Sequence, residues 1–319
     1  MKEFAILAIL RKGNDMIKYI LKRVAILLVT LWVVITLSFF LMQILPGTPY
    51  NNPKLTEEMI ALLNKQYGLD KPVWQQYLTY LWNVLHGDFG TSYQSVNQPV
   101  SRMISLRLGV SVHLGVQALV FGVLGGILVG AISARHKNDK VDGILSVIAT
   151  LGISMPSFII GILLLDYFGF KWNLLPLSGW GTFSQTILPS LALGLPTLAS
   201  VSRFFRSEMI ETLNSDYVQL ARSKGMTIRQ VTRKHAYRNS MIPILTLIGP
   251  LAAGLLTGSA LIEQIFSIPG IGQQFVTSIP TKDYPVIMGT TIVYAVMLMV
   301  AILITDVVIS IVDPRVRLQ

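Results

Sequence analysis

Histidines are the first residues to test for chemistry in this 319-residue chain, because imidazole serves both as a metal ligand and as a general base. The four are His86, His113, His136 and His235, and they form neither an HExxH pair nor a close set with carboxylates. A zinc protease site is therefore not predicted. His113 is better interpreted as a packed or interfacial residue than as a ligand.

Nucleophile and nucleotide motifs are also missing from the sequence. No serine lies in a GxSxG motif, and no GxxxxGK[ST] segment could cradle the phosphates of ATP. The chain has no cysteine, which excludes disulfides, thiol catalysis and Cys-ligated metals. We therefore expect no catalytic residues, no bound metal and no cofactor held by this chain.

The composition instead indicates a membrane protein. Hydrophobic residues make up 52% of the chain and charged residues 13%, and the mean hydropathy is +0.59. Ordinary soluble domains are far less apolar. The net charge is +10, but Lys and Arg gather in the segments between apolar stretches, so binding to nucleic acid is not predicted.

Six apolar stretches have the length of transmembrane helices, which is about 17–25 residues. They are 20–45, 108–134, 141–165, 186–202, 242–262 and 284–311. The sequence thus predicts an all-α integral membrane protein with six spans, of which the last five, within 108–311, would form the core. Basic residues predominate on one side of these spans, so the positive-inside rule places both termini in the cytoplasm.

The ends of the chain are expected to be small cytoplasmic segments. Residues 312–319 are predicted to be a tail, and residues 1–19 a cytoplasmic or interfacial segment. The apolar run 4–10 is too short to span a bilayer, and we expect it to lie in the interface as a short helix. A signal peptide is the alternative, but no small-residue cleavage site precedes the first span.

The polar stretch 46–107 is predicted to form a small extracytoplasmic helical domain. Apolar residues recur at helical spacing after a possible cap at Thr56, and again from Trp74 to Leu85. Two amphipathic helices are too few for an independent core. They could dock a partner, or merely cover the outer ends of the spans.

The cytoplasmic loop 203–241 carries the most distinctive pattern. Thr227 and Gln230 have the spacing of a capping box that opens a helix, and Gly225 suits the left-handed turn before it. Ala221 and Gly225 would leave a smooth face on which another backbone could rest. The second half of the loop is strongly basic, which could also mean only that the loop is held inside by its charge.

Within the spans, small and helix-weakening residues mark packing faces and hinges. Glycines 122, 126 and 130 recur every four residues, which favours close helix packing. Proline removes a backbone hydrogen bond, and it produces either a hinge or a simple bend. Glu263 could line a path or lie at the membrane interface, because a buried carboxylate is costly unless paired or wetted. The candidate hinge or pore residues are Pro156, Pro196, Pro250, Gly254, Gly258 and Glu263.

The loop motif resembles the coupling loop of ABC importer permeases. Gln219, Leu220 and Ala221 stand at the Glu-Ala-Ala positions of that pattern, Gly225 keeps its glycine, and an Ile-Pro pair closes the loop at Pro243. The segments GLDKPVWQQYLTYL, HGDFGTS and EQIFSIPGIG look like the B-type subunit of oligopeptide and dipeptide permeases. The resemblance runs from about residue 16 to residue 317.

The resemblance implies the type I ABC importer permease fold and a set of partners. The partners would be a C-type permease subunit, two ATP-binding subunits that use ATP and Mg²⁺, an extracytoplasmic solute-binding protein and a peptide substrate, all at the bacterial cell membrane. Closure of the ATPases would rock the spans on either side of the loop through their prolines. The residues expected to contact an ATPase are Asp216, Tyr217, Gln219, Ala221, Arg222, Lys224 and Gly225. The residues expected to dock the binding protein are Asp70, Trp74, Tyr77, Asp88 and Phe89.

Two alternatives stay open at this point. Within the same family the substrate could be nickel, a metal chelate or glutathione instead of a peptide. Outside it, an ion-coupled secondary transporter would need acidic residues at mid-depth and often shows inverted repeats. Spans one, two and four have no such acidic residue, which counts against that class.

Overall fold

The computed structural model describes residues 2–44, 50, 56–95, 97–232 and 236–312, with side chains described outside 2–19, 228, 256–258 and 309–312. Those residues form helices and connecting turns and no strand, apart from an isolated bridge between Thr91 and Pro99. The helices are α1 Lys2–Ile44, α2 Glu57–Tyr67, α3 Val73–Leu85, α4 Val100–Arg135, α5 Lys140–Ser154, α6 Ser157–Leu164, the π-helical η1 Leu165–Lys171, α7 Phe183–Leu213, α8 Asp216–Ser223, α9 Ile228–Val231, α10 Tyr237–Gly258, α11 Ala260–Ile265, α12 Ile271–Ser278 and α13 Tyr284–Val312.

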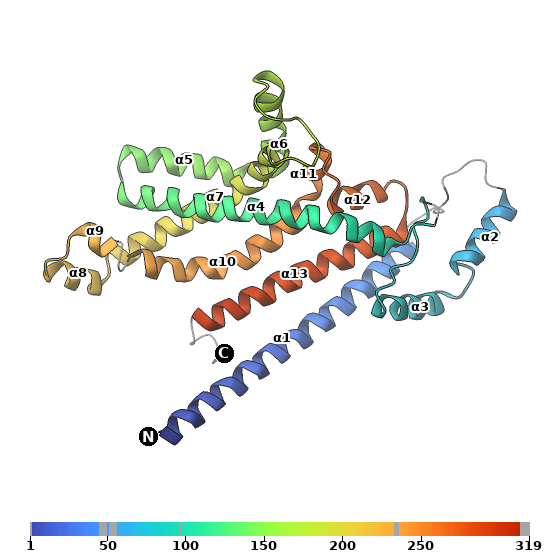
Figure 1. Cartoon of the computed structure of the whole chain (residues 1–319), viewed down its shortest axis with the longest axis horizontal. Helices are drawn as coiled ribbons and strands as arrows, with labels where there is room; N and C mark the ends of the chain where they lie inside the picture. The colour runs from blue at the N-terminus through green and yellow to red at the C-terminus, as the bar shows by residue number, and fades with distance from the viewer. Residues whose placement is uncertain (1, 45–49, 51–55, 96, 233–235, 313–319) are drawn as a thin grey trace.

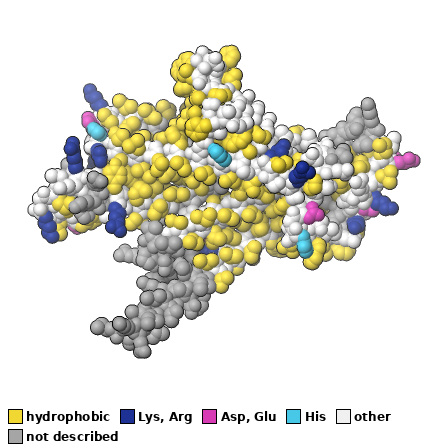
Figure 2. Space-filling model, in the orientation of Figure 1, with side chains coloured by type: hydrophobic (Ala, Val, Ile, Leu, Met, Phe, Trp, Pro, Cys, Tyr) yellow, Lys and Arg dark blue, Asp and Glu magenta, His cyan; other side chains and the backbone are white. Residues whose placement is uncertain are grey.

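The long helices run side by side between two ends of the molecule (Figure 1). Helices α8 and α9 lie at one end, α2 and α3 at the other, and the first turns of α1 and the last turns of α13 point toward the α8–α9 end. On the face drawn in Figure 2, apolar side chains cover the middle and most charged side chains lie toward the two ends. This distribution suits a bundle whose middle lies in hydrocarbon.

Four helical stretches of the described chain are long and apolar enough to cross a membrane: Ile20–Ile44, Val100–Arg135, Phe183–Leu213 and Tyr284–Val308. The pair Lys140–Ser154 and Ser157–Lys171 counts as a fifth if it is one span, which is then bent by 107° at the break. Pro156 begins the second half with an extended backbone (ψ 140°). The predicted bend at this proline is therefore a complete break of the helix.

The glycine row packs α4 against α7, as the spacing predicts. A Cβ atom on Gly122 would lie 2.7 Å from Thr197 Cγ2, and one on Gly130 would lie 2.6 Å from the Ser202 carbonyl oxygen. Gly194 on α7 is equally close to α4, because its Cβ would lie 2.8 Å from the Ala118 carbonyl oxygen. Only residues without a side chain permit this approach.

Several helix bounds differ from those expected. The helix of α1 is continuous from Lys2, so no separate short helix precedes the first span. The helix α4 begins at Val100, inside the stretch expected to be external. Helix α7 continues to Leu213, well past the predicted end at 202, and its C-cap is Asn214. The basic residues after 202 do not end the helix, because arginine is a good helix former.

The two predicted helices of the polar stretch are present. The Thr56 side chain caps α2 by accepting a hydrogen bond from the Met59 N–H at 3.4 Å. Helix α3 packs on the outer part of α1, where Tyr77 Oη lies 2.7 Å from Thr36 Oγ1 and the Tyr77 ring lies 5.4 Å from the ring of Phe39. Helices α2 and α3 thus form a small layer at one end of the bundle.

Candidate functional site

Helix α8 presents an exposed face beyond the end of the bundle. It begins after Ser215, which has the extended backbone of an N-cap, and Asp216 in its first turn favours the helix dipole. It ends at Lys224, and Gly225 follows with φ +87°, the left-handed conformation predicted for this glycine. A Cβ on Gly225 would meet nothing within 4 Å, so its surface is open.

The side chains of α8 divide into a buried side and an exposed surface. Val218 is completely buried, and Ala221 is half-buried. The other predicted contact residues are exposed, and they are Asp216, Tyr217, Gln219, Arg222, Lys224 and Gly225. The structure therefore brings the predicted set together on one short helix and its cap.

Helix α8 is hydrogen-bonded to α10, and α10 is in turn hydrogen-bonded to α7. Asn239 Nδ2 on α10 donates to Tyr217 Oη at 2.7 Å. Ser240 Oγ on α10 donates to Thr212 Oγ1 on α7 at 3.3 Å. These two bonds connect α8 to α10 directly and to α7 by way of α10.

The turn after α8 follows the predicted capping pattern. The Thr227 N–H donates to Gln230 Oε1 at 2.9 Å, and the Gln230 N–H donates to Thr227 Oγ1 at 3.4 Å. The helix that this box opens, α9, is described only as Ile228–Val231. Residues 233–235, which hold two of the basic residues of the loop, lie outside the described residues.

A partly buried ion pair joins α7 to the first turn of α5. Arg206 Nε and Nη2 donate to the two carboxylate oxygens of Asp142 at 2.7 and 2.6 Å. Ser133 Oγ and the Asn138 N–H donate to the same carboxylate at 2.5 and 2.9 Å. Two-point contact of this kind fixes the relative orientation of both partners.

The candidate hinge residues converge on one groove between three parts of the bundle. Pro156 at the α5–α6 break, Pro196 on α7, and Pro250 and Gly254 on α10 line it together. The groove has a volume of about 340 Å³, and the other residues that line it are Met155, Ser157, Leu193, Thr197, Leu251 and Leu255. These residues are apolar apart from two hydroxyls, so the groove has no charged site.

Glu263 lies elsewhere, with no exposed surface. Ser111 Oγ and Ser259 Oγ donate to Oε1 at 2.7 and 2.9 Å, and the Gln273 N–H donates to Oε2 at 3.0 Å. The carboxylate thus sits at the N-terminal end of α12, next to Gly270, where a Cβ would be only 2.4 Å from its Cδ. Hydrogen bonds and the helix end compensate its burial. In this conformation Glu263 joins α4, α11 and α12 and does not line an open path.

The remaining hinge candidate is Gly258, the last residue of α10, which lies outside the residues whose surroundings are described.

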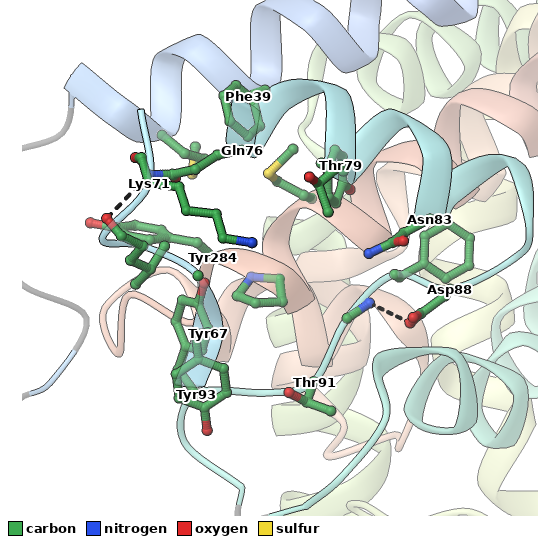
Figure 3. Close-up of a pocket in the computed structure, with 18 of the residues that line it drawn as sticks. Phe39, Tyr67, Lys71, Gln76, Thr79, Asn83, Asp88, Thr91, Tyr93 and Tyr284 are labelled. Carbon is green, nitrogen blue, oxygen red and sulfur yellow. Dashed lines mark hydrogen bonds between the residues drawn. The ribbon is translucent and has the colours of Figure 1, made fainter. Parts of the chain in front are cut away.

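At the α2–α3 end of the molecule, a cavity of about 500 Å³ lies between the end of α1, α3, the segment 88–93 and the start of α13 (Figure 3). It is called the outer cavity below. Lys71 and Asp88 line it with opposite charges, and the rings of Tyr67 and Tyr93 pack at a tilt with their centroids 4.7 Å apart. Burial raises the pKa of Tyr93 above its usual value, so this phenol stays protonated at physiological pH. The cavity offers aromatic surface, donors and acceptors together.

The five residues predicted to dock a binding protein do not form one surface. Asp88 and Phe89 line the outer cavity, whereas Asp70 and Trp74 are exposed on and before α3. Tyr77 turns inward onto α1. Helical spacing predicted α3 but could not decide which of its faces meets α1.

Three features were not predicted from the sequence: one exposed apolar side chain and two side-chain contacts between distant residues. Leu220 is a large apolar side chain 57% exposed on α8, and its apolar character in a basic loop was an available signal. The pair of Asp142 and Arg206 had no such signal, because 64 residues separate its members. The same holds for the contact between Tyr217 and Asn239.

Two family models match the chain. Residues 16–115 match the N-terminal segment of the binding-protein-dependent transport system membrane component, and residues 126–318 match the inner membrane component itself. The dipeptide transport system permease protein DppB of Lactococcus lactis is 62% identical over 303 residues, covering 95% of this chain and all of that protein. The oligopeptide transport system permease protein OppB of Haemophilus influenzae is 36% identical over 305 residues, again covering 95% of this chain and all of that protein.

Solved structures agree on the fold. A methionine ABC transporter, MetNI, in an inward-facing conformation has a chain that matches with a TM-score of 0.57 at 16% identity, over 66% of this chain and 96% of that one. An amino acid ABC transporter matches with a TM-score of 0.55 at 17% identity, over 66% of this chain and 94% of that one. The apolar helices and the family together make this a multi-pass protein of the bacterial cell membrane. The chain belongs to the family of binding-protein-dependent transport system inner membrane components.

Proposed function

We propose that the chain is the transmembrane subunit of an ATP-driven peptide importer and forms half of its translocation path. A C-type permease subunit would supply the other half, two ATP-binding subunits the energy, and an extracytoplasmic solute-binding protein the peptide. The names of the relatives at 62% and 36% identity favour dipeptides or oligopeptides over nickel, metal chelates or glutathione.

The proposed topology has six spans with both termini in the cytoplasm. The spans are α1, α4, the bent pair α5 and α6, α7, α10 and α13. The position of α8 and α9 at the same end as the start of α1 and the end of α13 supports this arrangement (Figure 1). Helices α2 and α3 then form the extracytoplasmic layer, and the outer cavity faces the binding protein.

One observation carries the mechanism: the three prolines and Gly254 line one groove, and of the helices that form it α10 is hydrogen-bonded to α8 and α7 is hydrogen-bonded to α10. An ATPase that holds the exposed face of α8 would pull α7 and α10 together when it closes on ATP. Movement at Pro196 and Pro250 would change the width of the groove. We assign the groove to the wall of the translocation path on this ground.

Affinity purification tests the function. The chain is tagged at its C-terminus, extracted gently from native membranes, and its partners are identified by mass spectrometry. We expect a second permease, ATPases and a solute-binding protein whose bound ligand is a peptide. Recovery of the chain alone, or of a homo-oligomer without an ATPase, would refute the proposal.

The role of α8 is tested with substitutions at exposed positions. Gly225→Trp and Leu220→Glu should remove the copurified ATPases and abolish uptake while the chain still inserts into the membrane. Gly87→Trp is the matched control, because Gly87 also has a left-handed backbone (φ +76°) and open space, but lies at the opposite end. Full uptake by either α8 variant, or equal loss in the control, would contradict the assignment.

The role of the groove is tested by labelling, because the chain has no cysteine of its own. Gly254→Cys places a thiol in the groove at an exposed position with open space. A bulky thiol reagent should then block peptide uptake in proteoliposomes. Gly143→Cys, which is also exposed with open space but lies outside the groove, should tolerate the same reagent. Unchanged uptake in the labelled Gly254→Cys transporter counts against a wall position.

A further inference from the structure

Helix α3 carries an apolar stripe that no other part of the described chain covers. Its members recur at positions 74, 78, 82 and 85, the spacing of one helix face. They are Trp74, Leu78, Trp82 and Leu85, exposed by 65, 55, 65 and 80%. None of the residues from Val73 to Leu85 is charged, although Lys71 and Asp88 lie just beyond the two ends. A neighbouring face packs on α1 through Tyr77, and the face opposite the stripe lines the outer cavity.

The contacts with α1 fix the depth of this helix. The apolar stretch Ile20–Ile44 has its midpoint at Trp32, and about ten residues at 1.5 Å each cover the roughly 15 Å from the bilayer centre to the edge of the hydrocarbon. That edge falls near Met42. Tyr77 bonds to Thr36 below it, and Gln76 accepts a hydrogen bond from Gln43 Nε2 at 3.0 Å just above it. Helix α3 therefore crosses α1 at the outer boundary of the hydrocarbon.

The surface of α1 at the same depth is apolar, as the stripe is. Leu37, Leu41 and Ile44 of α1 are apolar and more than half exposed. Tryptophan is enriched where hydrocarbon meets head groups, because its ring is apolar and its N–H can remain hydrogen-bonded. Two tryptophans on an uncharged helix at this depth match that environment.

We propose that the face of α3 formed by Trp74, Leu78, Trp82 and Leu85 is an anchor in the outer leaflet of the bilayer, and that the lipid interface is its partner. The anchor holds the outer cavity, which α3 lines from its other face, at a fixed height above the membrane. This reassigns Trp74 from protein docking to lipid contact. The inference rests on the proposed topology, in which α1 spans the bilayer from a cytoplasmic N-terminal end. It is independent of the peptide substrate and of the ATPases.

Site-specific fluorescence tests the anchor in the complete transporter in lipid nanodiscs. Leu78→Cys is labelled with an environment-sensitive fluorophore, and the signal of the unsubstituted complex after the same labelling is subtracted. Quenching is measured with a nitroxide lipid labelled near the head group, with one labelled near the chain end, and with aqueous iodide. Glu58→Cys on α2 serves as the aqueous control and Leu28→Cys, which is 60% exposed on α1, as the control within the hydrocarbon.

We expect the label at position 78 to be quenched several-fold more by the shallow nitroxide lipid than by iodide, since interfacial side chains lie within about 5–10 Å of the boundary between head groups and acyl chains. Leu85→Cys should behave in the same way, which guards against one badly placed label. Iodide quenching equal to that of Glu58→Cys would overturn the proposal. Protection from all three quenchers would overturn it as well, because a protein partner would then cover the face.

Discussion

The partly buried pair of Arg206 and Asp142 yields the sharpest energetic prediction. The Asp142 side chain is only 6% exposed, so removal of the guanidinium leaves an ionised carboxylate in a site with little water. Breaking a buried pair from one side typically costs about 3–5 kcal/mol. Arg206 is 29% exposed, and Ser133 and the Asn138 N–H still donate to the carboxylate. We therefore expect about 2–3 kcal/mol for Arg206→Gln, below the full range for a buried pair.

A double-mutant cycle measures the interaction energy between Arg206 and Asp142. The free energy of unfolding is determined in mixed micelles for Arg206→Gln, Asp142→Asn and the double variant. Each single change should cost about 2–3 kcal/mol, and the double variant should cost clearly less than their sum, because neither charge is then left alone. Arg203→Gln is the control, since Arg203 lies one turn earlier on α7 and is exposed, and it should change the free energy by less than about 0.5 kcal/mol. Additive costs in the cycle, or singles no worse than the control, would refute the reasoning.

Two further predictions concern packing and buried polar groups. Gly126→Ala would place a Cβ 2.7 Å from the Leu198 carbonyl oxygen, so α4 and α7 must separate, at a cost of about 1–3 kcal/mol in the free energy of unfolding. Gly109→Ala on the same helix meets nothing within 4 Å and should leave the thermal unfolding midpoint of the complex unchanged, and equal midpoints for both variants would contradict the packing argument. Glu263→Gln keeps one acceptor oxygen but turns an amide N–H₂ toward a donor such as Ser111 Oγ or the Gln273 N–H, which should cost about 1–3 kcal/mol. An unchanged midpoint for that variant would show that the carboxylate does not hold α12 in place.

Local signals predicted local structure well. The cap at Thr56, the capping box of Thr227 and Gln230, and the left-handed Gly225 all occur as the sequence indicates. Each depends on residues at most three positions apart, so sequence spacing contains the whole interaction. The glycine row on α4 succeeded for a related reason, because an absent side chain allows close approach by whichever helix packs there.

Long-range signals were the ones that failed or fell short. Pro156, Pro196 and Pro250 belong to three different predicted spans, and only the tertiary structure shows that they share one groove. Glu263 illustrates the limit most clearly. A carboxylate in an apolar segment could line a path or lie at the membrane interface, and only the hydroxyl of Ser111, 152 residues away, and the end of α12 explain its complete burial.

The sequence by itself determined that this protein is a helical membrane permease, because apolar length, the distribution of basic residues and the loop motifs are one-dimensional properties. Only the tertiary structure decided what each side chain meets. It turned Tyr77 toward α1 and Trp74 away from it, and it joined Arg206 to a residue 64 positions earlier in the chain. The physical reason is that helical periodicity defines faces, whereas packing between helices decides which face is buried.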